Sequence, residues 1–100
     1  MKLYWKTKDG RVLLISQIPI QHLENIKGLL ERTASRIISE EINIGYEVLM
    51  TLRGEMATYY AEQAIHVWEG MTPEIFLKTY IPQYEAVCYW LSRKQGALNS

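Results

Sequence analysis

Residues 47–69 carry the pattern that most restricts what this chain can fold into. Polar side chains recur there every three or four positions, the spacing of one side of an α-helix. Nearly all other positions are apolar or small, so the helix has an apolar arc wider than one neighbouring helix covers. The pattern predicts either a central helix packed on two sides or a surplus face for a partner. The polar positions are Glu47, Thr51, Glu55, Thr58, Glu62, His66 and Glu69.

The first fifteen residues predict a β-hairpin. Side chains alternate over residues 3–7, with Trp5 on the side that would face a core, and residues 11–15 supply a second apolar strand. Asp9-Gly10 is a strong hairpin signal, because glycine adopts the positive φ that primed turns need. Since a lone hairpin is marginally stable, we expect Trp5 to pack it on a helix. We therefore interpret the first fifteen residues mainly as a structural element of the fold.

Apolar spacing and helix-end signals predict that the remaining chain is helical. Pro19 suits the start of a first helix, and Thr72-Pro73 is typical of a later start, with a hydroxyl cap and a proline in the first turn. Pro82 is expected to separate the last two helices. The predicted helices cover about residues 20–34, 40–69, 73–81 and 82–95, and the second and last of them end at Gly70 and Gly96.

The break between the first two helices has two candidate positions. Ser39 can cap a helix with an acidic first turn, which favours a break within residues 33–39. The Asn-Ile-Gly sequence at 43–45 favours a later break. The residues themselves leave both positions open.

Together these elements predict a single α+β domain over residues 1–100, in which a hairpin over residues 3–15 packs on a bundle of three to four helices. The 11 basic and 11 acidic side chains give a net charge of zero, whereas nucleic-acid-binding proteins usually have a basic excess. Cys88 is the only cysteine, which excludes an intrachain disulfide and a thiolate zinc cage. No apolar run has the length of a signal peptide or a membrane span, so we expect a soluble, cytoplasmic protein.

Catalytic and metal-binding patterns are weak. Glu62, His66 and Glu69 share one predicted helix face, but their spacing is not that of di-iron bundles and fits a solvated face better. Cys88 falls on an apolar stripe, where a free cysteine behaves as a small hydrophobic residue. We therefore predict no enzyme activity, no cofactor and no metal.

The aromatic residues are the more informative anomaly. Seven Tyr and three Trp against one Phe mean that nearly every aromatic ring carries a polar group, as is common at interfaces and at the rim of a core. Three interpretations stay open: a solvated core edge, a protein-binding or self-association face, and stacking on nucleic-acid bases. The candidate partner-binding residues are Tyr46, Tyr60, Trp68, Tyr80, Tyr89 and Trp90. The wide apolar arc over residues 44–69 also predicts self-association as a dimer.

Two small basic clusters define the alternative of a nucleic-acid-binding module. Lys6, Lys8 and Arg11 surround the predicted hairpin turn, and Arg93 and Lys94 follow the aromatic pair near the C-terminus. Each cluster holds only two or three charges, which an ordinary solvated surface explains equally well.

Residues 5–32 resemble small phage and prophage proteins. The shared features are the pattern W-x-T-x-D-G at the start, an Ile-containing strand, H-L-x-N from His22 to Asn25, and a following L-E-R. The chain departs from that pattern in its four residues before Trp5 and in Pro19. The resemblance implies a phage setting and a protein that binds a host or phage protein, including inhibitors of CRISPR and related defences. His22 and Asn25 are expected to hydrogen-bond back to the hairpin and fix the first helix to it.

Overall fold

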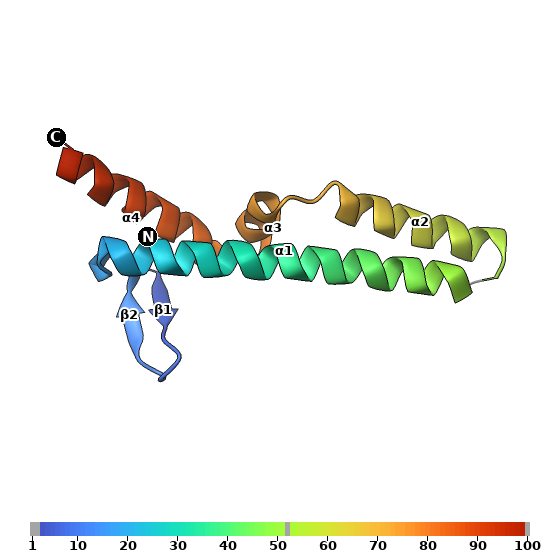
Figure 1. Cartoon of the computed structure of the whole chain (residues 1–100), viewed down its shortest axis with the longest axis horizontal. Helices are drawn as coiled ribbons and strands as arrows, with labels where there is room; N and C mark the ends of the chain where they lie inside the picture. The colour runs from blue at the N-terminus through green and yellow to red at the C-terminus, as the bar shows by residue number, and fades with distance from the viewer. Residues whose placement is uncertain (1–2, 52, 100) are drawn as a thin grey trace.

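The computed structural model describes residues 3–51 and 53–99 as a hairpin followed by four α-helices (Figure 1). The predicted α+β class, a hairpin on a helical bundle, is confirmed. The strands are β1 (Tyr4–Lys6) and β2 (Val12–Leu14), and a single 3-10 turn, η1 (Ile15–Gln17), follows them. The helices are α1 (Ile20–Thr51), α2 (Glu55–Glu69), α3 (Pro73–Tyr80) and α4 (Pro82–Asn99).

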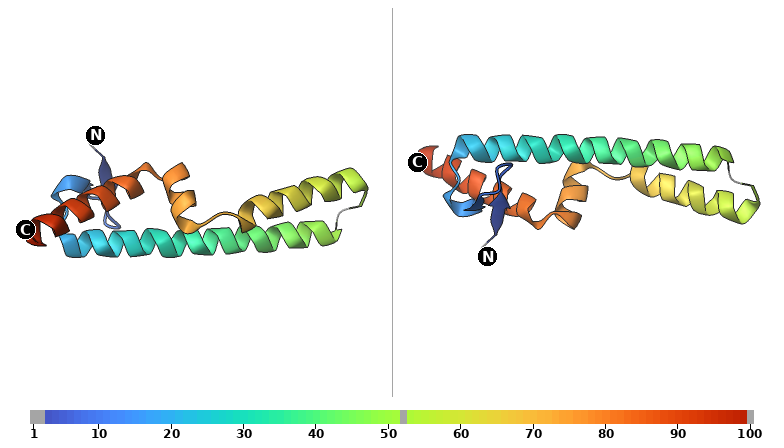
Figure 2. Two further views of the ribbon diagram at one scale, coloured as in Figure 1. Left: turned by 90° about the horizontal axis from the view of Figure 1, so that it is seen from above. Right: turned by 90° about the horizontal axis from the view of Figure 1, so that it is seen from below.

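The other helices all lie along one long helix, α1. Its 32 residues run most of the length of the molecule, and α4, α3 and α2 lie along it in that order (Figures 1 and 2). The hairpin, α3 and α4 gather at the first half of α1, and we call residues 3–38 and 70–99 the body. The second half of α1 pairs with α2 alone in an antiparallel projection, residues 39–69, which we call the arm.

This arrangement makes the molecule elongated. Its principal extents are 59 × 32 × 21 Å, and its radius of gyration is 18.1 Å. A compact domain of this length has a radius of gyration of about 13 Å. The difference comes from the arm, which projects beyond the body instead of folding back on it (Figure 2).

The body holds the hydrophobic core. One cluster joins η1, α1 and α4 through Ile15, Ile18, Leu23, Ile26, Val87 and Leu91, and Trp5 of the hairpin packs against it. A second cluster joins α1, α3 and α4 through Ala34, Leu77 and Tyr84. The expected role of Trp5, packing the hairpin on helices, is thus confirmed, as is the apolar stripe of α4.

The hairpin pairs Trp5 with Leu13 and is closed by a short loop between Thr7 and Arg11. The Thr7 amide donates to the Arg11 carbonyl (2.7 Å) and the Gly10 amide donates to the Thr7 carbonyl (3.0 Å). Gly10 has a φ of +91°, so it closes a three-residue loop rather than a two-residue primed turn. The positive φ expected at Gly10 is confirmed.

Both candidate breaks in the first helix are wrong. α1 continues through residues 33–39 and 43–45, and the interruption lies at Arg53-Gly54, inside the predicted 40–69 helix. Gly54 has a φ of +98°, which favours glycine, so this position can reverse the chain. Residues 33–45 stay helical because Ala34 packs in the core and Gly45 packs closely on α2. The predicted polar stripe over 47–69 is consequently divided between two antiparallel helices.

The C-terminal elements agree closely with the sequence. The Thr72 hydroxyl accepts a hydrogen bond from the Ile75 amide (3.1 Å), with Pro73 in the first turn of α3. α3 ends at Tyr80, before Pro82, as predicted. Gly96 does not end α4, which continues to Asn99, and Gly70 follows α2 with a φ of −83° rather than in the left-handed conformation.

Candidate functional site

The arm is the least buried part of the molecule. Among the residues that the structure describes, eleven hydrophobic side chains are buried, and Ile65 is the only one that the arm contributes. Ile65 packs on Gly45 so closely that a Cβ at that glycine would lie 2.6 Å from Ile65 Cγ1. The two helices therefore meet along a narrow seam, which leaves both broad sides of the arm in water.

One broad side is apolar, and we call it the apolar side. Ile44 and Val48 of α1 and Ala61, Ala64 and Trp68 of α2 line a shallow groove there, with Gly45 and Ile65 between them. Tyr60 and Val67 flank Ala64 at helical spacing and are 63% and 61% exposed. Glu41 lies at the end of the groove nearest the body and is its only charged lining residue among those described.

The opposite broad side, the acidic side, carries carboxylates and tyrosines. Glu55, Glu62 and Glu69 recur every seven residues along α2, and Glu55 and Glu62 line a shallow depression with Thr58 and Tyr59 near the arm's tip. The Tyr46 hydroxyl of α1 donates a hydrogen bond to Glu69 Oε1 at 2.5 Å. This bond to a carboxylate raises the pKa of Tyr46, so the phenol stays protonated as a donor. The α2 part of the predicted polar stripe therefore lies on this side.

Charge is divided between the two regions, a feature that the zero net charge conceals. The arm holds six Glu and one Arg, a net charge of −5, and the rest of the chain holds the balancing +5. Sequence reasoning did not use this asymmetry, although a charge count in windows along the chain would have found it.

The predicted aromatic residues do not form one face. Tyr46 lies on the acidic side of the arm, whereas Trp68 lies on the apolar side with its ring 6.2 Å from that of Phe76, and the ring of Tyr60 contacts Tyr59 at 5.7 Å. Tyr80 is exposed at the end of α3, with its ring 5.1 Å from Phe76. Tyr89 and Trp90 lie on α4, far along α1 from the arm (Figure 1).

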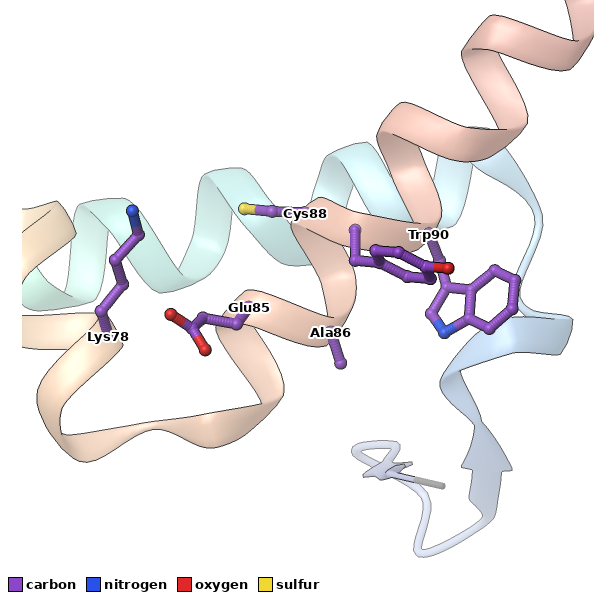
Figure 3. Close-up of a pocket in the computed structure, with 6 residues that line it drawn as sticks. Lys78, Glu85, Ala86, Cys88 and Trp90 are labelled. Carbon is purple, nitrogen blue, oxygen red and sulfur yellow. The ribbon is translucent and has the colours of Figure 1, made fainter. Parts of the chain in front are cut away.

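Tyr89 and Trp90 border a cavity of about 660 Å³ beside α4. Their rings meet edge to face at 5.1 Å, and the remaining lining residues are Lys78, Glu85, Ala86 and Cys88. Figure 3 shows Lys78 and Glu85 at one end of the cavity and Trp90 at the other. Its described lining includes no histidine, so Cys88 has no base beside it of the kind that activates a thiol.

The two basic clusters are partly engaged within the chain. Lys94 Nζ donates to the Ile18 carbonyl (2.6 Å), so it fixes α4 to the 3-10 turn. Arg93 donates to the Tyr89 hydroxyl (3.1 Å), and Arg11 pairs with Asp9 across the hairpin loop (3.0 Å). Lys6 and Lys8 remain exposed.

The other interactions that the sequence suggested, a metal site and hydrogen bonds from the first helix to the hairpin, are not formed by the described residues. Over residues 3–51 and 53–99, no group of three or more His, Cys, Asp or Glu side chains is placed to hold a metal ion. His22 and Asn25 line a cavity against the hairpin with Trp5 and Thr7. Within the described part of the chain, however, neither side chain hydrogen-bonds to the hairpin, and Asn25 instead accepts a bond from Gln21 (3.4 Å).

Comparisons with protein-family models, curated proteins and solved structures give no match of any kind. Among the described residues, no helix combines the length and the apolar character that crossing a membrane requires.

Proposed function

We propose that this chain is a small non-enzymatic protein-binding module and that the arm is its binding element. The observation that carries the proposal is the exposed aromatic and apolar surface of the arm, of which Tyr46 and Tyr59 lie on the acidic side. Monomeric proteins rarely expose contiguous apolar surface unless it serves an interaction. The large apolar and aromatic side chains that the arm exposes are Ile44, Tyr46, Val48, Met50, Met56, Tyr59, Tyr60 and Val67.

The acidic side favours a partner with a basic surface. Tyr46 and Tyr59 are 47% and 54% exposed there and offer rings with polar ends, the kind of side chain that dominates binding energy at interfaces. The surrounding glutamates would attract a basic partner and orient it, because complementary charge speeds encounter and disfavours wrong partners. We therefore assign the acidic side to the heterologous partner.

The resemblance of residues 5–32 to phage and prophage proteins supports a host or phage protein as this partner. Binding would take place in the cytoplasm. One consequence would be inhibition of a host defence complex such as a CRISPR effector.

A nucleic-acid-binding module has less support. The candidate basic residues lie on the body, where Arg11 and Lys94 already have partners within the chain, and the chain has no net basic charge.

The test is affinity capture with the tagged full chain in a nuclease-treated bacterial lysate at moderate salt, read by mass spectrometry. We expect one protein in near-stoichiometric amount, whose binding is then measured with purified components. Glu62→Lys should weaken that binding at least ~10-fold, because it reverses a charge at the proposed contact. Glu47→Lys makes the same charge change on α1, outside both sides of the arm, and should leave the affinity within about twofold.

Equal losses in the two variants would contradict the assignment to the acidic side. Material that binds only without nuclease and is released by salt would favour the nucleic-acid alternative instead.

A further inference from the structure

We infer that the apolar side of the arm is the contact surface for a second copy of this chain, and that two arms pair about a twofold axis as a four-helix bundle. This inference goes beyond the proposed function, because it concerns the other side of the arm and leaves the acidic side free. It begins from the surface area of the chain.

A single chain exposes more surface than a compact protein of its size. Compact monomers of 11.7 kDa expose about 5,900 Å² by the usual scaling of surface with mass. This chain exposes 7363 Å², so the excess is about 1,500 Å². A stable dimer typically buries about 800 Å² per partner. The excess is thus large enough for a dimer interface.

The apolar side has the composition of a bundle core. Ile44 and Val48 from one helix and Ala61, Ala64 and Trp68 from the other lie on the same side of the seam. Four-helix bundles form when two helical hairpins cover such surfaces against each other. A twofold pairing brings the same patch from both chains together, so this one surface would supply both halves of the interface.

The charge distribution favours a second copy on this side and not on the other. Glu55, Glu62 and Glu69 follow the acidic side, so they would stay in water on the outside of the paired arms. Glu41 lies at the body end of the groove, where it remains at the rim. Pairing through the acidic sides would instead bury like charges against each other, at a large cost in free energy.

The decisive variant is Ala64→Glu, studied in the full-length chain. Ala64 is exposed in the single chain and glutamate is a good helix former, so the folded monomer should tolerate the change. In the dimer the new carboxylate would be buried twice, once per chain. We expect the dimer dissociation constant to rise at least ~100-fold.

The measurement is molar mass by multi-angle light scattering and sedimentation equilibrium, with circular dichroism to check helicity. Wild type should have twice the mass of one 11.7 kDa chain, and Ala64→Glu should have the mass of one chain. Gln63→Glu adds the same charge one position away, outside the groove lining, and should remain dimeric. Val48→Glu tests the α1 half of the same surface and should also be monomeric.

Wild type that is monomeric at ~100 µM would overturn the inference, since obligate interfaces of this size saturate well below that concentration. Ala64→Glu and Val48→Glu that stay dimeric would place any dimer contact elsewhere, and dissociation of Gln63→Glu would show a general charge effect. Each of these results leaves the proposed function intact, because that is tested at Glu62 and read as capture of a different protein. Loss of capture in Glu62→Lys with an unchanged dimer mass would separate the two surfaces.

Discussion

The two halves of α1 have the same backbone conformation but very different surroundings. The first half places Leu23, Ile26 and Ala34 in a core that also receives side chains from the 3-10 turn η1, α3 and α4. The second half, beyond Ile38, has no buried side chain among its described residues, and its main neighbour is α2. A helix in contact with one neighbour cannot bury a wide apolar arc, whereas one with several neighbours can. The body thus buries its apolar surface by itself, whereas the arm leaves much of its apolar surface in water.

The largest expected effect tests the body side of this comparison. Leu23 is fully buried, so Leu23→Ala should lower the free energy of unfolding by about 2–5 kcal/mol through the cavity that it leaves. Leu29 lies on the same helix but is 49% exposed, so Leu29→Ala should cost less than about 1 kcal/mol. Urea unfolding followed by circular dichroism at one fixed protein concentration measures both. Similar losses in the free energy of unfolding at the two positions would mean that this half of α1 does not pack on the core through Leu23.

The second prediction tests the seam of the arm with two glycines of α1. A Cβ at Gly45 would lie 2.6 Å from Ile65 Cγ1, so Gly45→Ala should force α1 and α2 apart and cost about 1–3 kcal/mol. A Cβ at Gly28 would meet only the mobile end of Arg32 at 3.1 Å. Gly28→Ala should therefore stabilise the protein by up to ~1 kcal/mol through helix propensity.

Thermal unfolding gives the sign of each change, and hydrogen exchange shows whether the loss in Gly45→Ala is confined to the arm. A stabilised Gly45→Ala variant would show that the two arm helices are free to move apart at no cost.

The smallest expected effect concerns the hairpin loop, at the edge of the body. The Thr7 hydroxyl donates to the Asp9 carboxylate, and with the Arg11 pairing this bond lowers the pKa of Asp9 below its ordinary value of 3.8. Because the pKa of Asp9 is lower in the folded state, the ionised carboxylate stabilises the loop fully when the pH is above the ordinary pKa. This stabilisation is lost as the pH falls through the lowered pKa. NMR titration of Asp9 together with amide exchange in the hairpin should show both changes at acid pH.

In Asp9→Asn the hairpin should lose this pH dependence while the buried core of the body keeps its protection. A titration of Asp9 at or above 3.8 in the wild type would contradict the bonded loop.

Sequence patterns correctly predicted several local features, each of which depends mainly on one residue type. Gly10 was expected at a positive φ, Thr72 at a helix cap, and Pro82 at a helix boundary, and the structure has each of them there. These features depend on the geometry of a few adjacent residues, so a short window of sequence contains the whole physical cause.

The candidate site was predicted only in part. Tyr46, Tyr60 and Trp68 all lie on the arm, but the sequence could not show that Tyr46 and Trp68 lie on different sides of it. Tyr89 and Trp90 belong to α4 in the body, and Lys94 stabilises a tertiary contact to Ile18 rather than a binding surface. Which side of a helix faces water depends on its neighbours, and those neighbours were assigned wrongly once the helix break was misplaced.

By itself, the sequence determined the class of fold, the hairpin, the two C-terminal helices and the surplus of apolar surface over residues 44–69. Only the tertiary structure decided that α1 runs unbroken through Ser39 and Asn43, because packing at Ala34 and Gly45 outweighs their weak preference for helix ends. Only the tertiary structure placed the reversal at Gly54, since the periodic pattern passes through that position without a change. The physical reason is that periodicity reports which residues share a side, whereas the course of the chain depends on contacts between residues distant in sequence.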